Sequence, residues 1–118
     1  MKYPWLDEYC KSKLGAEKDF KVEWDATRYL IGGKMFAMQG GDKNKKAIIT
    51  LKCHPQFGRS LRKDYKDVVA GYYMNKEHWN SVYLDGDVPD NILKQMIDMS
   101  YESVLSSLSK KKQMEIIG

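Results

Sequence analysis

The chain has 118 residues and a formal net charge of +4, with 42% hydrophobic and 31% charged residues. Its size and composition predict one globular domain that buries roughly two-thirds of its unfolded surface, and three Trp, eight Tyr and three Phe exclude a disordered chain. No apolar run reaches the roughly 18 residues of a membrane span, and no hydrophobic signal segment follows Met1, so we expect a cytoplasmic protein.

A first amphipathic helix is predicted close to the N-terminus. Pro4 suits a first-turn position, and Gly15 is a typical helix terminator. The apolar residues between them recur at helical spacing and form the buried stripe: Leu6, Tyr9, Cys10 and Leu14. This stripe needs a packing partner, and the segments that follow indicate a sheet.

Four segments with strand character come next, at residues 20–24, 28–31, 34–38 and 47–53. Gly32 and Gly33 separate two of them and predict a two-residue hairpin turn, because glycine reaches the positive φ angles of such turns. The following turn, residues 40–46, is longer and basic. It carries Lys43, Lys45 and Lys46.

A second helix is predicted from Pro55, followed by strands at 68–73 and 80–84 and a turn at 85–87. In this helix Phe57, Leu61 and Tyr65 form the buried side, which leaves Arg59, Arg62, Lys63 and Lys66 on the open side. The longest helix begins at Pro89 and Asp90. Its core residues recur at helical spacing: Ile92, Leu93, Met96, Ile97, Tyr101, Val104, Leu105 and Leu108.

These elements predict an α+β fold in which helices cover one face of an antiparallel sheet. Residues 1–108 form the single domain, and residues 109–118 form a basic C-terminal tail that we expect to be frayed. The alternation in 47–53 places Ala47, Ile49, Leu51 and Cys53 on one face of the strand.

The charges are distributed unevenly along the chain. Residues 43–66 contain eight basic side chains and one acid, Asp64, whereas residues 67–109 contain seven acids and only Lys76 and Lys94. Such a layout gives one surface a positive potential despite the small net charge, although the same residues also suit ordinary solvated faces.

The segment GYYMNKEHWNSV, from Gly71 to Val82, combines aromatic, amide and basic residues without the alternation of a plain strand. Together with GGKMFA at 32–37, LDG at 84–86 and Pro89-Asp90, it resembles the MmcQ/YjbR family of small bacterial proteins, over about Tyr9 to Leu108. The resemblance implies a CyaY-like fold, similar in outline to frataxin, and a DNA-binding role without an established substrate or partner. The chain departs from the family at residues 20–25, where many members carry a Pro-Phe-Gly-like turn.

The sequence gives no support for catalysis, a metal site or a cofactor. Cys10 and Cys53 suit buried thiols rather than a disulfide framework. Asp7 and Glu8 are followed by Lys11 and Lys13, which argues against an acidic metal-binding helix. His78 has no nucleophile elbow beside it, so we expect a protein that is not an enzyme.

The favoured hypothesis is therefore DNA binding by basic turns and a polar corner, with a regulator as one form of that function. Lysines would contact phosphates, and amide or imidazole groups would contact sugars, phosphates or base edges. The candidate residues are Lys34, Lys43, Lys45, Lys46, Arg59, Arg62, Lys63, Lys66, Asn75, Lys76, His78 and Asn80.

Two alternatives stay open. The surface from Tyr72 to Trp79 also suits a protein–protein interaction module, because Tyr, Trp and Met are enriched at interfaces. The same cluster could line a small-molecule pocket between sheet and helices. Trp79 is expected to pack as an anchor rather than to stack on a base. The sequence does not indicate the oligomeric state, and a monomer is one option.

Overall fold

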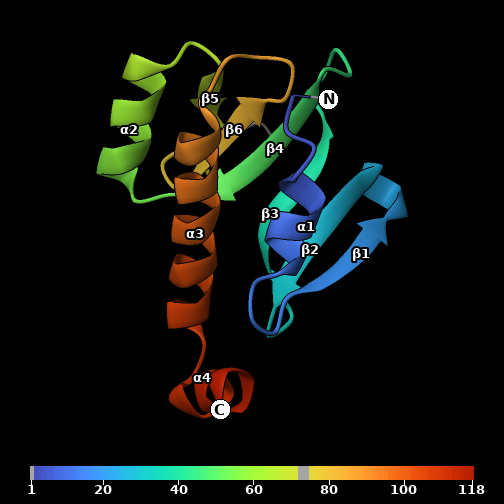
Figure 1. Cartoon of the computed structure of the whole chain (residues 1–118), viewed down its shortest axis with the longest axis vertical. Coiled ribbons are helices and arrows are strands. Elements are labelled where there is room, and N and C mark those ends of the chain that lie inside the picture. The colour runs from blue at the N-terminus through green and yellow to red at the C-terminus, as the bar shows by residue number, and fades with distance from the viewer. Residues whose placement is uncertain (1, 72–74) are drawn as a thin grey trace.

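The computed structural model describes residues 2–71 and 75–118 and contains a six-stranded antiparallel sheet with the order β1-β2-β3-β4-β6-β5. The helices lie in front of this sheet or at its ends (Figure 1), which confirms the predicted α+β class. The elements are α1 (Leu6–Lys11), β1 (Glu17–Lys21), the 3-10 helix η1 (Val22–Trp24), β2 (Ala26–Ile31), β3 (Lys34–Gly41), β4 (Ala47–Lys52), α2 (Pro55–Asp64), β5 (Val68–Ala70), β6 (Trp79–Tyr83), α3 (Asp90–Ser107) and α4 (Lys110–Ile117).

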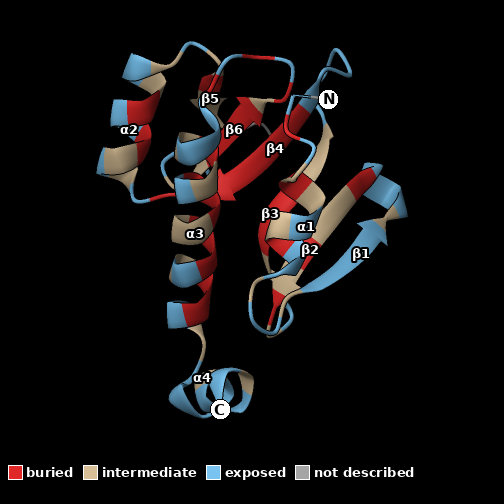
Figure 2. Cartoon of the chain, viewed as in Figure 1, coloured by how far each residue is buried: buried red, intermediate tan, exposed pale blue. Residues whose placement is uncertain are grey.

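The core lies between the sheet and α3. Strand alternation turns Ala37, Leu51 and Val82 toward the helices, and all three are fully buried. The stripe of α3 that faces them is buried along its length (Figure 2) and begins with the fully buried Leu93 and Met96. None of the helices in the described part of the chain is long and apolar enough to cross a membrane.

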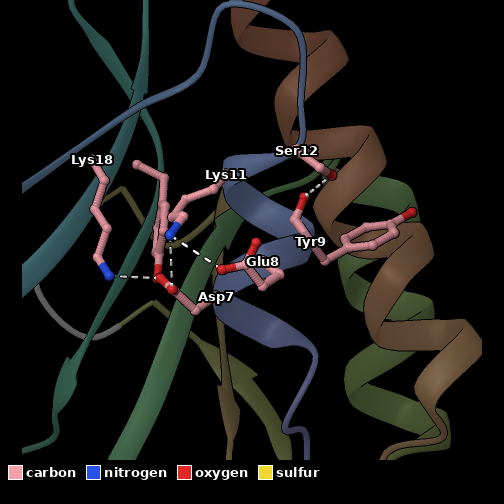
Figure 3. A network of polar contacts seen from close by, with 7 residues as sticks. Asp7, Glu8, Tyr9, Lys11, Ser12 and Lys18 are labelled. Atoms are coloured by element: carbon pink, nitrogen blue, oxygen red, sulfur yellow. Dashed lines mark hydrogen bonds and ion pairs between the residues drawn. The ribbon is translucent and has the colours of Figure 1, made fainter.

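Helix α1 is attached to the sheet by polar contacts as well as by its apolar residues (Figure 3). The Asp7 carboxylate accepts hydrogen bonds from the Lys18 ammonium and the Tyr29 hydroxyl, each at 2.7 Å. On the opposite side of α1, the Tyr9 hydroxyl donates to Asp98 of α3 at 2.7 Å. Lys11 pairs with Asp7 at 3.5 Å, so the first acidic group of the chain is held by two cations.

The predicted strand at 20–24 is wrong in position. Strand β1 ends at Lys21, and Val22–Trp24 form a 3-10 turn closed by Asp25 in a left-handed conformation with φ of 50°. Apolar character misled the prediction here, since Phe20, Val22 and Trp24 are more than half exposed. Leu14 is likewise 57% exposed, because α1 ends at Lys11, before the helical stripe could include it.

The C-terminal segment is a helix rather than a frayed tail. The Ser109 side chain caps α4 by accepting a hydrogen bond from the Lys112 backbone N–H at 3.1 Å. Ile116 packs on the turn at Gly15, where a Cβ would lie 2.7 Å from the Ile116 side chain, and a Cβ on Gly32 would lie 2.7 Å from Leu108. Both glycines also have a positive φ, which a larger residue would adopt only with strain. A long-range contact thus orders a segment whose composition alone indicated disorder.

A β-bulge in β3 is repaired by a side chain from α3. Tyr29 pairs with Ala37 but Leu30 pairs with Met35, so Phe36 is an extra residue in the ladder. The Ser100 hydroxyl donates to the Phe36 carbonyl and accepts from the Lys52 backbone N–H at 2.8 Å. It thereby bridges the two backbone groups that continuation of the β3–β4 ladder would bring together.

Candidate nucleic-acid interface

The turn between β3 and β4 is organised by one carboxylate. Asp42 accepts hydrogen bonds from the backbone N–H groups of Asn44 at 2.8 Å and Lys46 at 3.0 Å. Its second oxygen accepts from the Tyr83 hydroxyl at 2.9 Å. The hydrogen bond from the Lys46 backbone N–H is the largest of the effects that lower the pKa of Asp42, and the other two bonds add to it. Lys45 completes the turn in a left-handed conformation with φ of 63°.

This turn projects three exposed lysines, Lys43, Lys45 and Lys46, from the end of the sheet. Within the described part of the chain none of them forms an ion pair with an acidic side chain. The Lys46 ammonium lies 5.8 Å from the centre of the Tyr83 ring, so its stem rests on the sheet. The result is an ordered turn that presents three exposed lysines without ion pairs among the described residues.

The basic side of α2 is partly committed to the fold. Arg59 and Lys63 are exposed, as is Lys66 just beyond the helix. Arg62 instead donates a hydrogen bond to the side-chain oxygen of Asn80 in β6. Gly58 permits this contact, because a Cβ there would lie only 2.8 Å from the Asn80 amide nitrogen.

Asn80 is fully buried, so we remove it from the candidate interface. Its neighbour His78 is half-buried, and the His78 carbonyl accepts from the Cys53 backbone N–H at 2.6 Å, which ties the corner to the end of β4. Asn75 and Lys76 are exposed. The Tyr72 to Met74 part of the predicted surface lies outside the described residues, and Trp79 is half-buried, in keeping with an anchor.

The candidate residues do not form one surface. In the β4–β6 ladder, Ile48 pairs with Tyr83 at the end beside the lysine turn, whereas Lys52 pairs with Trp79 at the end beside the corner. Four residues separate these two ends of the ladder, so at about 3.3 Å per residue they are roughly 13 Å apart. Lys34 sits elsewhere again, at the start of β3 in the β2–β3 hairpin.

Acidic residues also interrupt the end that carries the lysine turn. The Leu84 backbone N–H donates to the Ala47 carbonyl at 3.0 Å, which places the exposed residues Asp85 and Asp87 next to that turn. Asp87 is paired with Lys2 at 2.8 Å. The two predicted wings are therefore separate, and the lysine turn is the more strongly organised of them.

A group that the sequence did not single out lies on the face of the sheet opposite α3. Trp24, 53% exposed, has the Lys21 ammonium 5.5 Å and the Arg28 guanidinium 5.7 Å from its ring centre. Arg28 also forms a two-pronged ion pair with Asp19, at 2.8 and 2.6 Å. The interpretation of residues 20–24 as a strand concealed this arrangement, since it gave Trp24 an ordinary packing role.

Both cysteines are free and buried. Burial raises the pKa of Cys10 to about 12 and that of Cys53 to about 11. Within residues 2–71 and 75–118, no three His, Cys, Asp or Glu side chains come together as a metal site. The acids of α1 lie against lysines instead, with Lys11 3.2 Å from Glu8.

A sequence model described as YjbR matches residues 11–103. The uncharacterized protein YjbR of Escherichia coli (strain K12) is 35% identical over 108 residues, which cover 92% of this chain and 91% of that protein. The uncharacterized protein YbdF of Escherichia coli O157:H7 is 33% identical over 97 residues, 82% of this chain and 77% of that protein.

Two solved structures have the same architecture. The crystal structure of Deinococcus radiodurans protein DR2400, which contains the domain DUF419, superposes with a TM-score of 0.83 at 26% identity, over 94% of this chain and 84% of that one. A crystal structure of a protein from Pseudomonas syringae gives a TM-score of 0.75 at 25% identity, over 88% of this chain and 99% of that one.

Proposed function

This chain belongs to the YjbR family, and on that premise we propose that it is a cytoplasmic, non-enzymatic DNA-binding protein. The lysine turn, Lys43, Lys45 and Lys46, is its main phosphate-binding element. The single observation that carries this proposal is the Asp42-organised backbone, which holds three unpaired ammonium groups together at one end of the sheet.

Rigid presentation matters because an ordered turn loses little further conformational entropy on binding. Ammonium groups attract phosphate oxygens as point charges without a demanding geometry. The exposed cations of α2, Arg59 and Lys63, form a separate basic region that supplies further phosphate contacts. Contacts of this kind fix the protein on the sugar–phosphate backbone and carry no sequence preference.

The test is a titration of labelled duplex DNA at about 50 and 200 mM salt. With about five phosphate contacts, log K plotted against log salt has a slope of about −4 to −5. Replacing the three lysines of the turn by alanine removes up to three contacts, so the slope becomes less steep by about 2.7. The stability of this variant is checked by urea unfolding.

The matched control is Lys110→Ala, Lys111→Ala, Lys112→Ala. These three lysines are exposed on α4, at the other end of the molecule from the lysine turn (Figure 1), and their loss changes the net charge by the same amount. Equal weakening by both triple variants would mean that only the overall charge matters. Absence of DNA binding at 50 mM salt would refute the proposal and favour the protein-interaction module around residues 72–79.

A further inference from the structure

A cavity of about 420 Å³ opens on the face of the sheet that the helices leave uncovered. Ala26, Met38 and Ile48 belong to three neighbouring strands, and their side chains point away from the α3 side. Glu23 and Trp24 form one wall, and Gly40 and Gly41 form another. This volume lies within the range of about 300 to 1,000 Å³ that small organic groups occupy in proteins.

The cavity lies directly beside the lysine turn. Gly41 lines the cavity and immediately precedes that turn. A Cβ on Gly41 would lie 3.1 Å from the Cα of Lys45, so the turn packs closely against the end of β3. The Lys46 ammonium lies 5.8 Å from the centre of the ring of Tyr83, and Tyr83 is the ladder partner of Ile48 in the cavity lining. An apolar recess with an exposed indole therefore adjoins the base of the lysine turn.

The charges around the indole are balanced. Lys21 pairs with Glu23 at 3.2 Å, and Arg28 pairs with Asp19. The wall of the cavity is consequently close to neutral, whereas the turn beside it is strongly positive. This division suits a ligand that carries a neutral planar ring on an anionic chain, which is the chemistry of a single-stranded nucleic acid.

We propose, building on the proposed DNA binding, that this cavity receives one unpaired base of single-stranded DNA, stacked on Trp24 while the lysine turn holds the adjoining phosphates. Met38 and Ile48 form the apolar floor beneath the ring. Glu23 accepts a hydrogen bond from the exocyclic amino group of the base, as carboxylates do with the amino group of cytosine. The site therefore favours cytosine over thymine, which has no such donor.

The experiment measures the affinity of labelled dC and dT 12-mers and of a duplex for the wild-type protein, Trp24→Ala and Trp24→Phe. Loss of one base-stacking contact weakens single-strand binding by about 5- to 150-fold. Trp24→Phe retains a stacking surface and recovers most of that loss. Duplex binding stays within about twofold of wild type, since paired bases cannot enter the cavity.

Val22→Ala is the matched control, because Val22 belongs to the same 3-10 turn, is 74% exposed and does not line the cavity. Glu23→Ala tests base preference. The ratio of dC to dT affinity is its readout, because a ratio is unaffected by the overall gain of positive charge. We expect a wild-type ratio of about ten that falls toward one in Glu23→Ala.

Single-strand affinity that is unchanged by Trp24→Ala overturns the inference and leaves the proposed function intact. If neither DNA form binds, the proposed function fails, and cytidine monophosphate is titrated while the Trp24 indole N–H is observed by NMR. A saturable shift of this resonance that the Val22→Ala control retains supports a nucleotide cavity without DNA binding. No shift up to about 10 mM, a concentration well above ordinary small-ligand affinities, overturns the cavity as well.

Discussion

Replacement of Ser100 by alanine tests how the sheet is held to α3. The Ser100 hydroxyl is fully buried and bridges the Phe36 carbonyl and the Lys52 backbone N–H across the bulge in β3. Alanine removes both hydrogen bonds and leaves two buried backbone groups without a partner.

The expected loss follows from the chemistry of the orphaned groups. A buried donor or acceptor left unsatisfied costs about 1 to 3 kcal/mol. Alanine is the better helix former by roughly 0.5 kcal/mol, which offsets part of this loss. We therefore expect Ser100→Ala to lower the free energy of unfolding by about 2 to 4 kcal/mol, a large share of the roughly 5 to 15 kcal/mol typical of single domains.

Urea unfolding with a common m-value is the assay, and Ser106→Ala is the control. Ser106 is exposed on the same helix, so its replacement reports the helix propensity alone. Hydrogen exchange at the Lys52 amide should accelerate in Ser100→Ala and stay unchanged in the control. If the free energies of unfolding of Ser100→Ala and Ser106→Ala agreed within about 0.5 kcal/mol, the bridging role of Ser100 would be refuted.

Two further predictions concern titratable groups. A hydrogen bond from Lys18, and to a smaller extent one from Tyr29, holds the pKa of Asp7 below its ordinary value of 3.8. The folded state is therefore stabilised by the ionised carboxylate above about pH 4, and this stabilisation is lost as the pH falls through the folded-state pKa. Urea unfolding should show that Asp7→Asn has a free energy of unfolding about 1 kcal/mol below that of the wild type at pH 7. The same difference in the free energy of unfolding at pH 2 would contradict this explanation. The thiol of Cys53, with its pKa raised from 9.0 to about 11, should react about a hundredfold more slowly than a free cysteine with a disulfide reagent at pH 8, and that of Cys10 more slowly still. Both should react at once in urea, whereas rapid labelling of the folded protein would disprove the burial of these thiols.

The periodicity of apolar residues in the sequence was sufficient to predict the main helices and strands. The apolar positions of α3, from Leu93 to Leu105, fall on one face because a helix repeats every 3.6 residues, whatever the partner. Gly32 and Gly33 predicted their hairpin because only residues tolerant of positive φ close such a turn. These are local properties of the chain, and the α+β class follows from them.

The sequence by itself thus determined the helices, the strands, the family resemblance and the uneven distribution of charge. Only the tertiary structure decided which charges meet: the 42–46 turn and the corner at 75–79 lie at opposite ends of the β4–β6 ladder. It also buried Asn80, ordered α4 and placed Trp24 in one cavity with Gly40 and Gly41, at the end of β3 that leads into the lysine turn. The physical reason is that register and packing depend on contacts between residues far apart in the chain, and local periodicity contains no information about those partners.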